Sequence, residues 1–191
     1  MPSDEGELEG MLDVEIEARV EPTTDFYYFG YGSNLLQERI RVGAFSATYV
    51  GVGRLDGFCL GFGGFCPNWR GAGATVFRQE GESVYGVVWK VRAEHSAVLD
   101  IQETKYHRLV APIVLLSTGE RLARCRLYQM TNVTEGNHLP SPHYKRVIVA
   151  GALEHDLPKD YTEQLKAMPD NGFSGTIHYD FSVLRDLNQR G

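Results

Sequence analysis

The chain has 191 residues, of which 42% are hydrophobic and 11% aromatic, as is typical of one globular domain with a substantial core. Its net charge of −6 is uneven: the first 25 residues hold nine acids and one base, and the remainder holds 16 acids and 18 bases. Because the bases are dispersed and no apolar run approaches a membrane-spanning length, we expect neither a nucleic-acid surface nor a membrane segment.

The N-terminal residues 1–24 are expected to form an acidic, flexible and solvated tail. Within them, residues 14–20 alternate between apolar and charged side chains, a pattern that is also compatible with docking on a sheet edge. The start of the chain lacks the basic flank and apolar segment of a secretory or mitochondrial signal. Three scattered cysteines argue against a disulfide framework, so we expect a reduced, cytoplasmic protein.

A predicted strand at Phe26–Phe29 runs directly into a glycine-rich turn and a predicted helix. Gly30 and Gly32 allow a positive φ and the close approach of another group. Asn34 and Gln37 have the spacing of a capping box. Such a turn leaves backbone amides aimed at one point, which suits a carboxylate or a developing oxyanion. An ordinary strand–turn–helix connection would explain the same residues.

The middle of the chain contains a series of predicted strands, at residues 47–55, 58–62, 74–78, 83–91, 106–116 and 121–130. A glycine-rich loop is expected at 63–73, and turn signals predict hairpins at 79–82 and 117–120. Residues 94–102 have the pattern of a short helix.

The C-terminal third is predicted to be helical. Ser141 and Pro142 form an N-cap followed by proline at the first helical position, and a second helix is expected at 158–168. The succession of strands with few helices predicts an α+β fold: a mainly antiparallel, closed or nearly closed β-barrel with a few flanking helices. We expect the domain to span residues 25–175, followed by a C-terminal extension at 176–191.

Several familiar kinds of site are not supported. The six histidines show no pairing at metal-ligand spacing, so no metal site is expected. Gly51-Val52-Gly53 precedes no helix, which argues against nucleotide binding. Ser33 lacks the elbow motif of a serine hydrolase.

The stretch Tyr28–Leu36 (Tyr-Phe-Gly-Tyr-Gly-Ser-Asn-Leu-Leu) closely resembles the signature of the γ-glutamylcyclotransferase family. Further stretches resemble that family's blocks in the same order: Trp69–Phe77, Tyr85–Trp89, Leu99–Glu103, Tyr128–Asn132 and Ser141–Lys145. The resemblance spans roughly residues 26–172. It implies a cytosolic enzyme that converts a γ-glutamyl amino acid to 5-oxoproline and a free amino acid, a reaction that requires no cofactor or metal. It also implies the homodimer that relatives form.

The resemblance also implies roles for particular residues. Glu103, in the Leu-Asp-x-x-Glu spacing, matches the family's acid/base, and Tyr144 matches a tyrosine that contacts substrate. The residues expected to bind substrate are Tyr28, Phe29, Gly30, Tyr31, Gly32, Ser33 and Tyr144. Relatives often have a glycine after the glutamate and a longer loop, whereas here only Thr104 and Lys105 separate Glu103 from Tyr106.

Two other functions stay open. A related cyclotransferase would act on γ-glutamylamines or glutathione, although the full Tyr-Gly-Ser-Asn-Leu form favours γ-glutamyl amino acids. A non-catalytic ligand-binding or interaction protein of the same fold would retain the barrel but not the function of Glu103. A small-molecule γ-glutamyl substrate is the expected partner of the enzyme.

Overall fold

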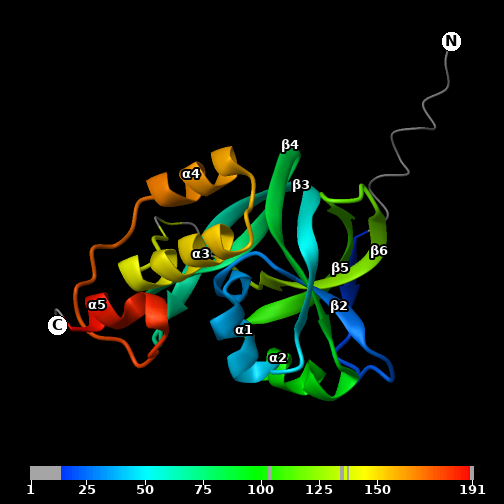
Figure 1. Cartoon of the computed structure of the whole chain (residues 1–191), viewed down its shortest axis with the longest axis horizontal. Coiled ribbons are helices and arrows are strands. Elements are labelled where there is room, and N and C mark those ends of the chain that lie inside the picture. The colour runs from blue at the N-terminus through cyan, green and yellow to red at the C-terminus, as the bar shows by residue number, and fades with distance from the viewer. Residues whose placement is uncertain (1–13, 103–104, 134–135, 137, 190–191) are drawn as a thin grey trace, which may run out of the picture.

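The computed structural model describes residues 14–102, 105–133, 136 and 138–189. Within these ranges the strands are β1 (Glu15–Glu17), β2 (Phe26–Gly30), β3 (Thr48–Cys66), β4 (Gly71–Val91), β5 (Tyr106–Leu115) and β6 (Arg121–Met130). They follow the order β1-β5-β3-β4-β2-β6, and a further pairing of β5 with β6 closes the last five into a barrel (Figure 1). Only β2 and β6 pair in parallel among these neighbours. The predicted, mainly antiparallel α+β barrel is therefore confirmed.

The long β3–β4 hairpin corrects two predictions. The expected glycine-rich loop at 63–73 is mostly paired strand, and β3 runs through Cys66, which faces Gly71 at the start of β4. The expected hairpin at 79–82 is wrong, because both flanking segments pair with β3 as parts of one strand. Residues 79–82 instead form a bulge, where Gly81 has a φ of 81°. A glycine flanked by polar residues is compatible with an exposed bulge as well as with a turn.

The helices flank the barrel at one end and along one side (Figure 1). They are η1 (Ser33–Leu35), α1 (Gln37–Gly43), η2 (Ala93–His95), α2 (Ser96–Gln102), α3 (Pro142–Glu154), α4 (Lys159–Ala167), η3 (Ser182–Leu184) and α5 (Arg185–Asn188). The N-cap of α3 is confirmed, since the amide of Tyr144 donates to Oγ of Ser141 at 3.1 Å. Among the described residues, no helix combines the length and the apolar character that crossing a bilayer requires.

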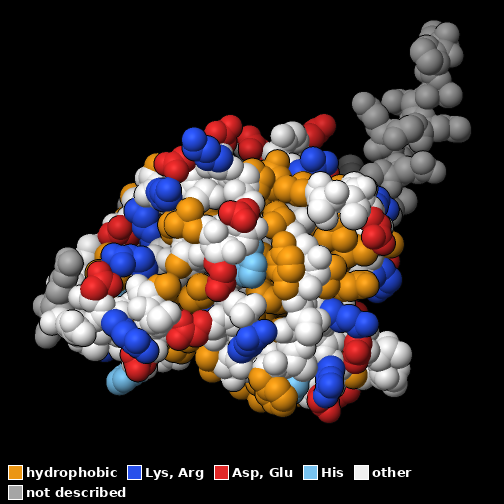
Figure 2. Space-filling view, viewed as in Figure 1, with side chains coloured by type: hydrophobic (Ala, Val, Ile, Leu, Met, Phe, Trp, Pro, Cys, Tyr) orange, Lys and Arg blue, Asp and Glu red, His pale blue; other side chains and the backbone are white. Residues whose placement is uncertain are grey.

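The core fills the barrel and the space under α3. Phe29, Trp89, Ile113 and Leu127 are fully buried within it. Helix α3 comes so close to η1 that a Cβ added to Gly151 would lie 2.5 Å from the backbone nitrogen of Leu36. This packing holds the turn after β2 against the barrel. On the face shown in Figure 2, acidic, basic and hydrophobic side chains are interspersed.

The ends of the described chain both contact the body. The alternation at 14–20 does dock on a sheet edge, because β1 pairs with β5 from Glu15 opposite Val110 to Glu17 opposite Arg108. A fully solvated tail is therefore wrong for these residues. At the other end, the buried side chains of Ile177 and Leu184 join the core. The division at residues 24 and 175 stays a prediction.

Candidate active site

The turn after β2 differs in its backbone from what the glycines suggested. Neither Gly30 nor Gly32 adopts a positive φ, and Gly32 has φ −106° and ψ −132°. The close approach is present: a Cβ on Gly30 would lie 2.9 Å from the carbonyl oxygen of Asn34, and one on Gly32 would lie 3.1 Å from both Cβ of Ala74 and Oη of Tyr144. The glycines are needed here for space rather than for a left-handed backbone.

The capping box is wrong, because a short 3₁₀-helix precedes α1. Leu36 is the N-cap residue of α1 and supplies no side-chain cap, and the amide of Gln37 instead donates to a carboxylate oxygen of Glu154 at 2.8 Å. Asn34 is 3% exposed, and its Nδ2 donates to the hydroxyl of Tyr28 at 2.9 Å. Its Oδ1 is buried with no partner among the described residues. The Asn34 side chain is thus oriented by its bond to a buried tyrosine, and its oxygen does not accept from the amides that begin α1.

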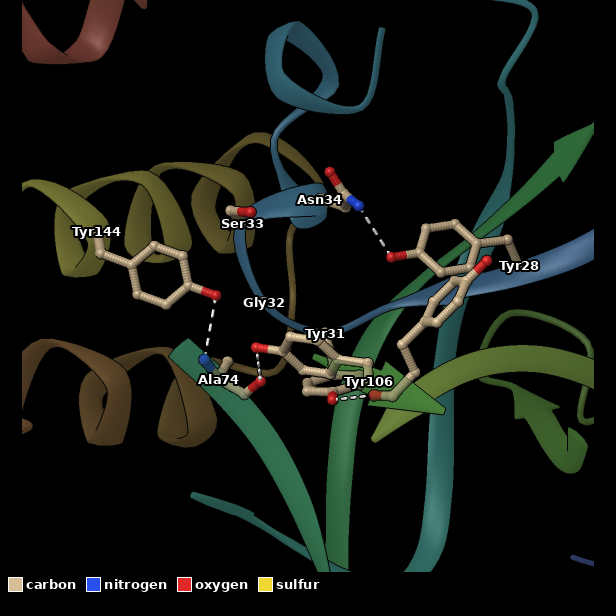
Figure 3. Close-up of a pocket in the computed structure, with 9 residues that line it drawn as sticks. Tyr28, Tyr31, Gly32, Ser33, Asn34, Ala74, Tyr106 and Tyr144 are labelled. Atoms are coloured by element: carbon tan, nitrogen blue, oxygen red, sulfur yellow. Dashed lines mark hydrogen bonds between the residues drawn. The ribbon is translucent and has the colours of Figure 1, made fainter. Parts of the chain in front are cut away.

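A small cavity of about 30 Å³ lies beside this turn, and we name it the tyrosine cavity (Figure 3). Its lining residues are Tyr28, Tyr31, Gly32, Ser33, Asn34, Ala74, Tyr106, Tyr128 and Tyr144. Two of the hydroxyls are fixed on the backbone of β4, because Oη of Tyr144 accepts from the amide of Ala74 at 3.2 Å and Tyr106 donates to the carbonyl of Ala74 at 2.9 Å. Its lining side chains are uncharged. The space suits one small polar group rather than a whole substrate.

A wider cavity of about 170 Å³ adjoins it, and both are lined by Ser33, Tyr106 and Tyr144. The remaining lining residues of this wide cavity are Arg39, Cys66, Pro67, Asn68, Trp69, Gly73, Gln102, Lys105 and Tyr179. Gln102 and Lys105 stand on either side of the segment that carries Glu103. Glu103 itself lies outside the described residues. The described residues on either side of Glu103 therefore line this cavity.

The predicted binding residues separate into two groups. Tyr28, Tyr31, Gly32, Ser33 and Tyr144 line the tyrosine cavity together. Phe29 and Gly30 line neither cavity, and Phe29 is fully buried in the core. This follows from the alternation of a strand, since Phe29 points to the opposite face of β2 from Tyr28.

Sequence reasoning did not single out several residues that line the two cavities, notably Arg39, Ala74 and Lys105. They come from α1, from β4 and from the residue that precedes β5, which lie far apart in the chain. Tyr128 lines the tyrosine cavity while remaining 2% exposed. None of these positions carries a local pattern that distinguishes it from an ordinary helix or strand residue.

Asp100, from the Leu-Asp-x-x-Glu stretch, anchors α2 to the barrel. It accepts from Nε of Arg108 at 2.9 Å, from Nη2 of Arg108, and from the hydroxyl of Tyr128 at 2.7 Å. Burial raises the pKa of the Asp100 carboxyl, but the hydrogen bonds from Arg108 and Tyr128 outweigh it and hold the pKa below its usual value. Burial and the adjacent Asp100 raise the pKa of Tyr128, so this hydroxyl stays protonated. The last turn before Glu103 is therefore fixed by an ionised Asp100.

The N-terminal segment reinforces the same region. Arg19 donates from Nη1 to the carbonyl of Asp100 at 3.2 Å and from Nη2 to the carbonyl of Tyr106 at 2.5 Å. These two carbonyls lie on either side of residues 101–105. Within the described ranges, no group of three or more His, Cys, Asp or Glu side chains is arranged to hold a metal ion.

Comparison with known proteins identifies the class to which this barrel belongs. The AIG2-like family matches residues 83–165. Curated relatives named gamma-glutamylcyclotransferase are 43% identical in Mus musculus and 40% identical in Homo sapiens, each over 87% of this chain and 89% of the relative. A solved structure named gamma-glutamyl cyclotransferase matches with a TM-score of 0.78 and 36% identity, covering 87% of this chain and 99% of that one.

The chain therefore belongs to the γ-glutamylcyclotransferase family, as its motifs predicted.

Proposed function

We propose that this protein is a γ-glutamylcyclotransferase that converts a γ-glutamyl amino acid to 5-oxoproline and a free amino acid. Family membership supports the reaction class. The observation that carries the proposal is the junction of the two cavities at Ser33, Tyr106 and Tyr144, beside the glycine turn and the segment of Glu103. Because the two cavities share these three residues, one substrate can reach both of them.

The reaction needs only proton transfers and a shaped site. The α-amine of the glutamyl group attacks the γ-carbonyl carbon, a five-membered ring closes, and the bond from that carbon to the leaving nitrogen breaks. The protons lost by the attacking ammonium end on the departing amine, so the step balances without a cofactor. A site that holds the glutamyl chain curled gains from proximity, for which effective molarities reach on the order of 10⁵ M or more.

We assign the proton transfers to Glu103 because of the family resemblance. Its neighbours Gln102 and Lys105 line the wide cavity, which supports placing its carboxyl beside the scissile amide. A carboxyl that takes a proton from an ammonium and returns it to the leaving nitrogen acts as both base and acid. A partly apolar cavity would raise the pKa of such a group by desolvation.

We assign one polar group of the glutamyl end, its α-carboxylate or the tetrahedral oxyanion, to the tyrosine cavity, which is too small for the whole glutamyl chain. The first amides of η1, at Ser33 and Asn34, have no acceptor within that helix. They border a cavity whose lining is uncharged, where they suit the substrate carboxylate or the tetrahedral oxyanion. Oδ1 of Asn34, which is buried without a partner among the described residues, is an acceptor suited to the α-ammonium group. We also propose a cytoplasmic location and a homodimer, on the family resemblance.

The test is mass-spectrometric detection of 5-oxoproline after incubation with γ-glutamyl dipeptides, γ-glutamylamines and glutathione. We expect dipeptides to be converted, and Glu103→Gln to lower turnover about a hundredfold or more while the protein stays folded. Glu94→Gln is the control, because Glu94 is an exposed glutamate that precedes α2 and lines neither cavity. Product from none of the substrates would favour a ligand-binding protein, and unchanged turnover in Glu103→Gln would remove that residue from the mechanism.

A further inference from the structure

Three arginines in the described part of the chain are buried, and one of them differs from the other two. Arg108 forms an ion pair with Asp100, and Arg126 donates to Glu17 at 3.1 Å. Arg39 is 6% exposed, yet no carboxylate of the described residues pairs with it. A guanidinium that is desolvated without an anion is unfavourable, so a buried site of this kind is suited to an anion that arrives with a ligand.

Neutral groups hold Arg39 in place. Its Nη1 donates to Oε1 of Gln102 at 3.2 Å, and its guanidinium carbon lies 5.5 Å from the ring centroid of Tyr179. Its Nε is buried and has no hydrogen-bond partner among the described residues. A guanidinium carries five N–H donors in one plane, so these contacts fix its orientation and leave donors unused.

The cavity that Arg39 lines is cationic. Lys105 also lines it, and its ammonium donates to the carbonyl of Phe65 at 2.9 Å. No acidic side chain stands among the described residues of its lining, and Trp69 supplies an apolar wall, with its ring 4.4 Å from that of Tyr179. The tyrosine cavity, in contrast, is lined by uncharged side chains. A carboxylate on an otherwise apolar group fits the wide cavity, where a guanidinium can bind it bidentately.

We propose that Arg39 binds the α-carboxylate of the amino acid that leaves, and so selects γ-glutamyl amino acids over γ-glutamylamines. The inference rests on the proposed function, which assigns one polar group of the glutamyl end to the tyrosine cavity. From there the substrate passes Ser33 and Tyr144 and extends its other end into the wide cavity. Arg39 is then a residue that determines specificity for the leaving group.

The kinetic test compares γ-glutamyl-alanine with γ-glutamyl-alaninamide, which has nearly the same shape but no second carboxylate. We expect kcat/KM to be higher for the acid, by roughly 10- to 100-fold, as is usual for a hydrogen bond to a charged group. Arg39→Gln should remove that preference by lowering kcat/KM for the acid, with the amide changed less than about twofold. Arg39→Lys should keep part of the preference, because the charge remains. Arg41→Gln is the control, since Arg41 is an exposed cation on the same helix.

Comparison with the amide substrate distinguishes two roles of Arg39, binding the carboxylate of the leaving group and positioning Gln102. Because Arg39 also holds Gln102, next to Glu103, a positioning role would lower kcat/KM equally for both substrates, and that result would overturn the proposal. The same result would follow if Arg39 bound the carboxylate of the glutamyl end. Equal rates for the two substrates in the unmodified enzyme would overturn it as well.

A binding measurement keeps the inference independent of turnover and of variant folding. Glutaryl-alanine and glutaryl-alaninamide lack the α-amine and cannot cyclise, so calorimetry can compare their affinities for the full-length protein. We expect tighter binding of the acid. If no γ-glutamyl substrate yields 5-oxoproline while the acid still binds more tightly, the carboxylate site stands and the proposed function fails. Equal affinities, or no binding of glutaryl-alanine, would overturn the carboxylate site even in an active enzyme.

Discussion

Replacing Arg108 with methionine removes the most fully buried charge that the structure describes while retaining most of the side-chain volume. The Arg108 side chain is 0% exposed and pairs with Asp100. It also donates to Oγ of Ser96 at 3.1 Å and to the carbonyls of Ala18 at 3.3 Å and Val20 at 3.0 Å. The variant leaves the Asp100 carboxylate buried with only Tyr128 as a hydrogen-bond donor from a described side chain.

The magnitude follows from the cost of a broken buried pair, which is about 3–5 kcal/mol. For 191 residues the entropy of unfolding is about 0.4 kcal/mol per kelvin, so the expected fall in Tm is roughly 8–12 °C. Asp100→Asn should destabilise the protein to a similar extent, because it leaves Arg108 with only the more distant Glu17 carboxylate, 3.9 Å from its Nη1. The double variant should lose less than the two single losses together, since it leaves no unpaired charge at this pair.

Urea and thermal unfolding of the two single variants and the double variant measure this coupling. Arg124→Met is the matched control, because the Arg124–Glu15 pair is 61% exposed on both sides and should contribute about 1 kcal/mol or less. Additive losses in the double variant, or a loss below about 1 kcal/mol for Arg108→Met, would refute a coupled buried pair. The pKa of Asp100 is lower in the folded state, so its contribution should be lost as the pH falls through its ordinary value of 3.8 and below.

Three further outcomes are expected. A chain that begins at Glu21 should melt well below one that begins at Val14, because Arg108 loses two carbonyl acceptors; equal melting temperatures would contradict this. Gly32→Val should abolish turnover and Gly32→Ala should reduce it less, since a Cβ would lie 3.1 Å from Oη of Tyr144. Calorimetry with 5-oxoproline beside a thermal melt checks this, and normal binding and turnover in a folded valine variant would disprove it. His143 is 1% exposed, and burial lowers its pKa below the usual 6.5, so protonation below pH 6.5 favours the unfolded state. His143→Phe should therefore lessen the loss of stability as the pH falls below 6.5, and parallel curves of stability against pH for the two proteins would count against this.

The sequence predicted the parts of the fold whose signals are local. Ser141 and Pro142 begin α3 as expected, because a side-chain cap acts within one turn. The bulge at 79–82 was mistaken for a turn, since its exposed glycine and polar residues satisfy either structure and only the pairing with β3 decides between them. The capping role of Asn34 failed because a 3₁₀-helix makes Leu36 the N-cap residue of α1, while the Asn34 side chain is held by the hydroxyl of Tyr28 in the folded core.

The site was predictable where one motif supplies it and not where the barrel assembles it. Gly32 and Ser33 stand in a recognisable stretch, and both line the tyrosine cavity. Arg39 looks like any charged residue of an amphipathic helix until α2 brings Gln102 to its side. The role proposed for Arg39 depends on the absence of a paired carboxylate among the described residues, and only the tertiary structure shows this.

The N-terminal segment contacts the described residues on either side of the short loop that the sequence predicts after Glu103. Arg19 contacts the carbonyls of Asp100 and Tyr106, which lie before and after residues 101–105. Arg108 joins the same segment to Asp100, so one end of the loop is fixed by a buried ion pair and both ends by Arg19. Because these contacts act on the ends of the loop, the chain that begins at Glu21 should lose turnover at temperatures where it is still folded. A truncated protein that melts early but keeps full turnover below its melting range would show that the segment stabilises the barrel without positioning the loop.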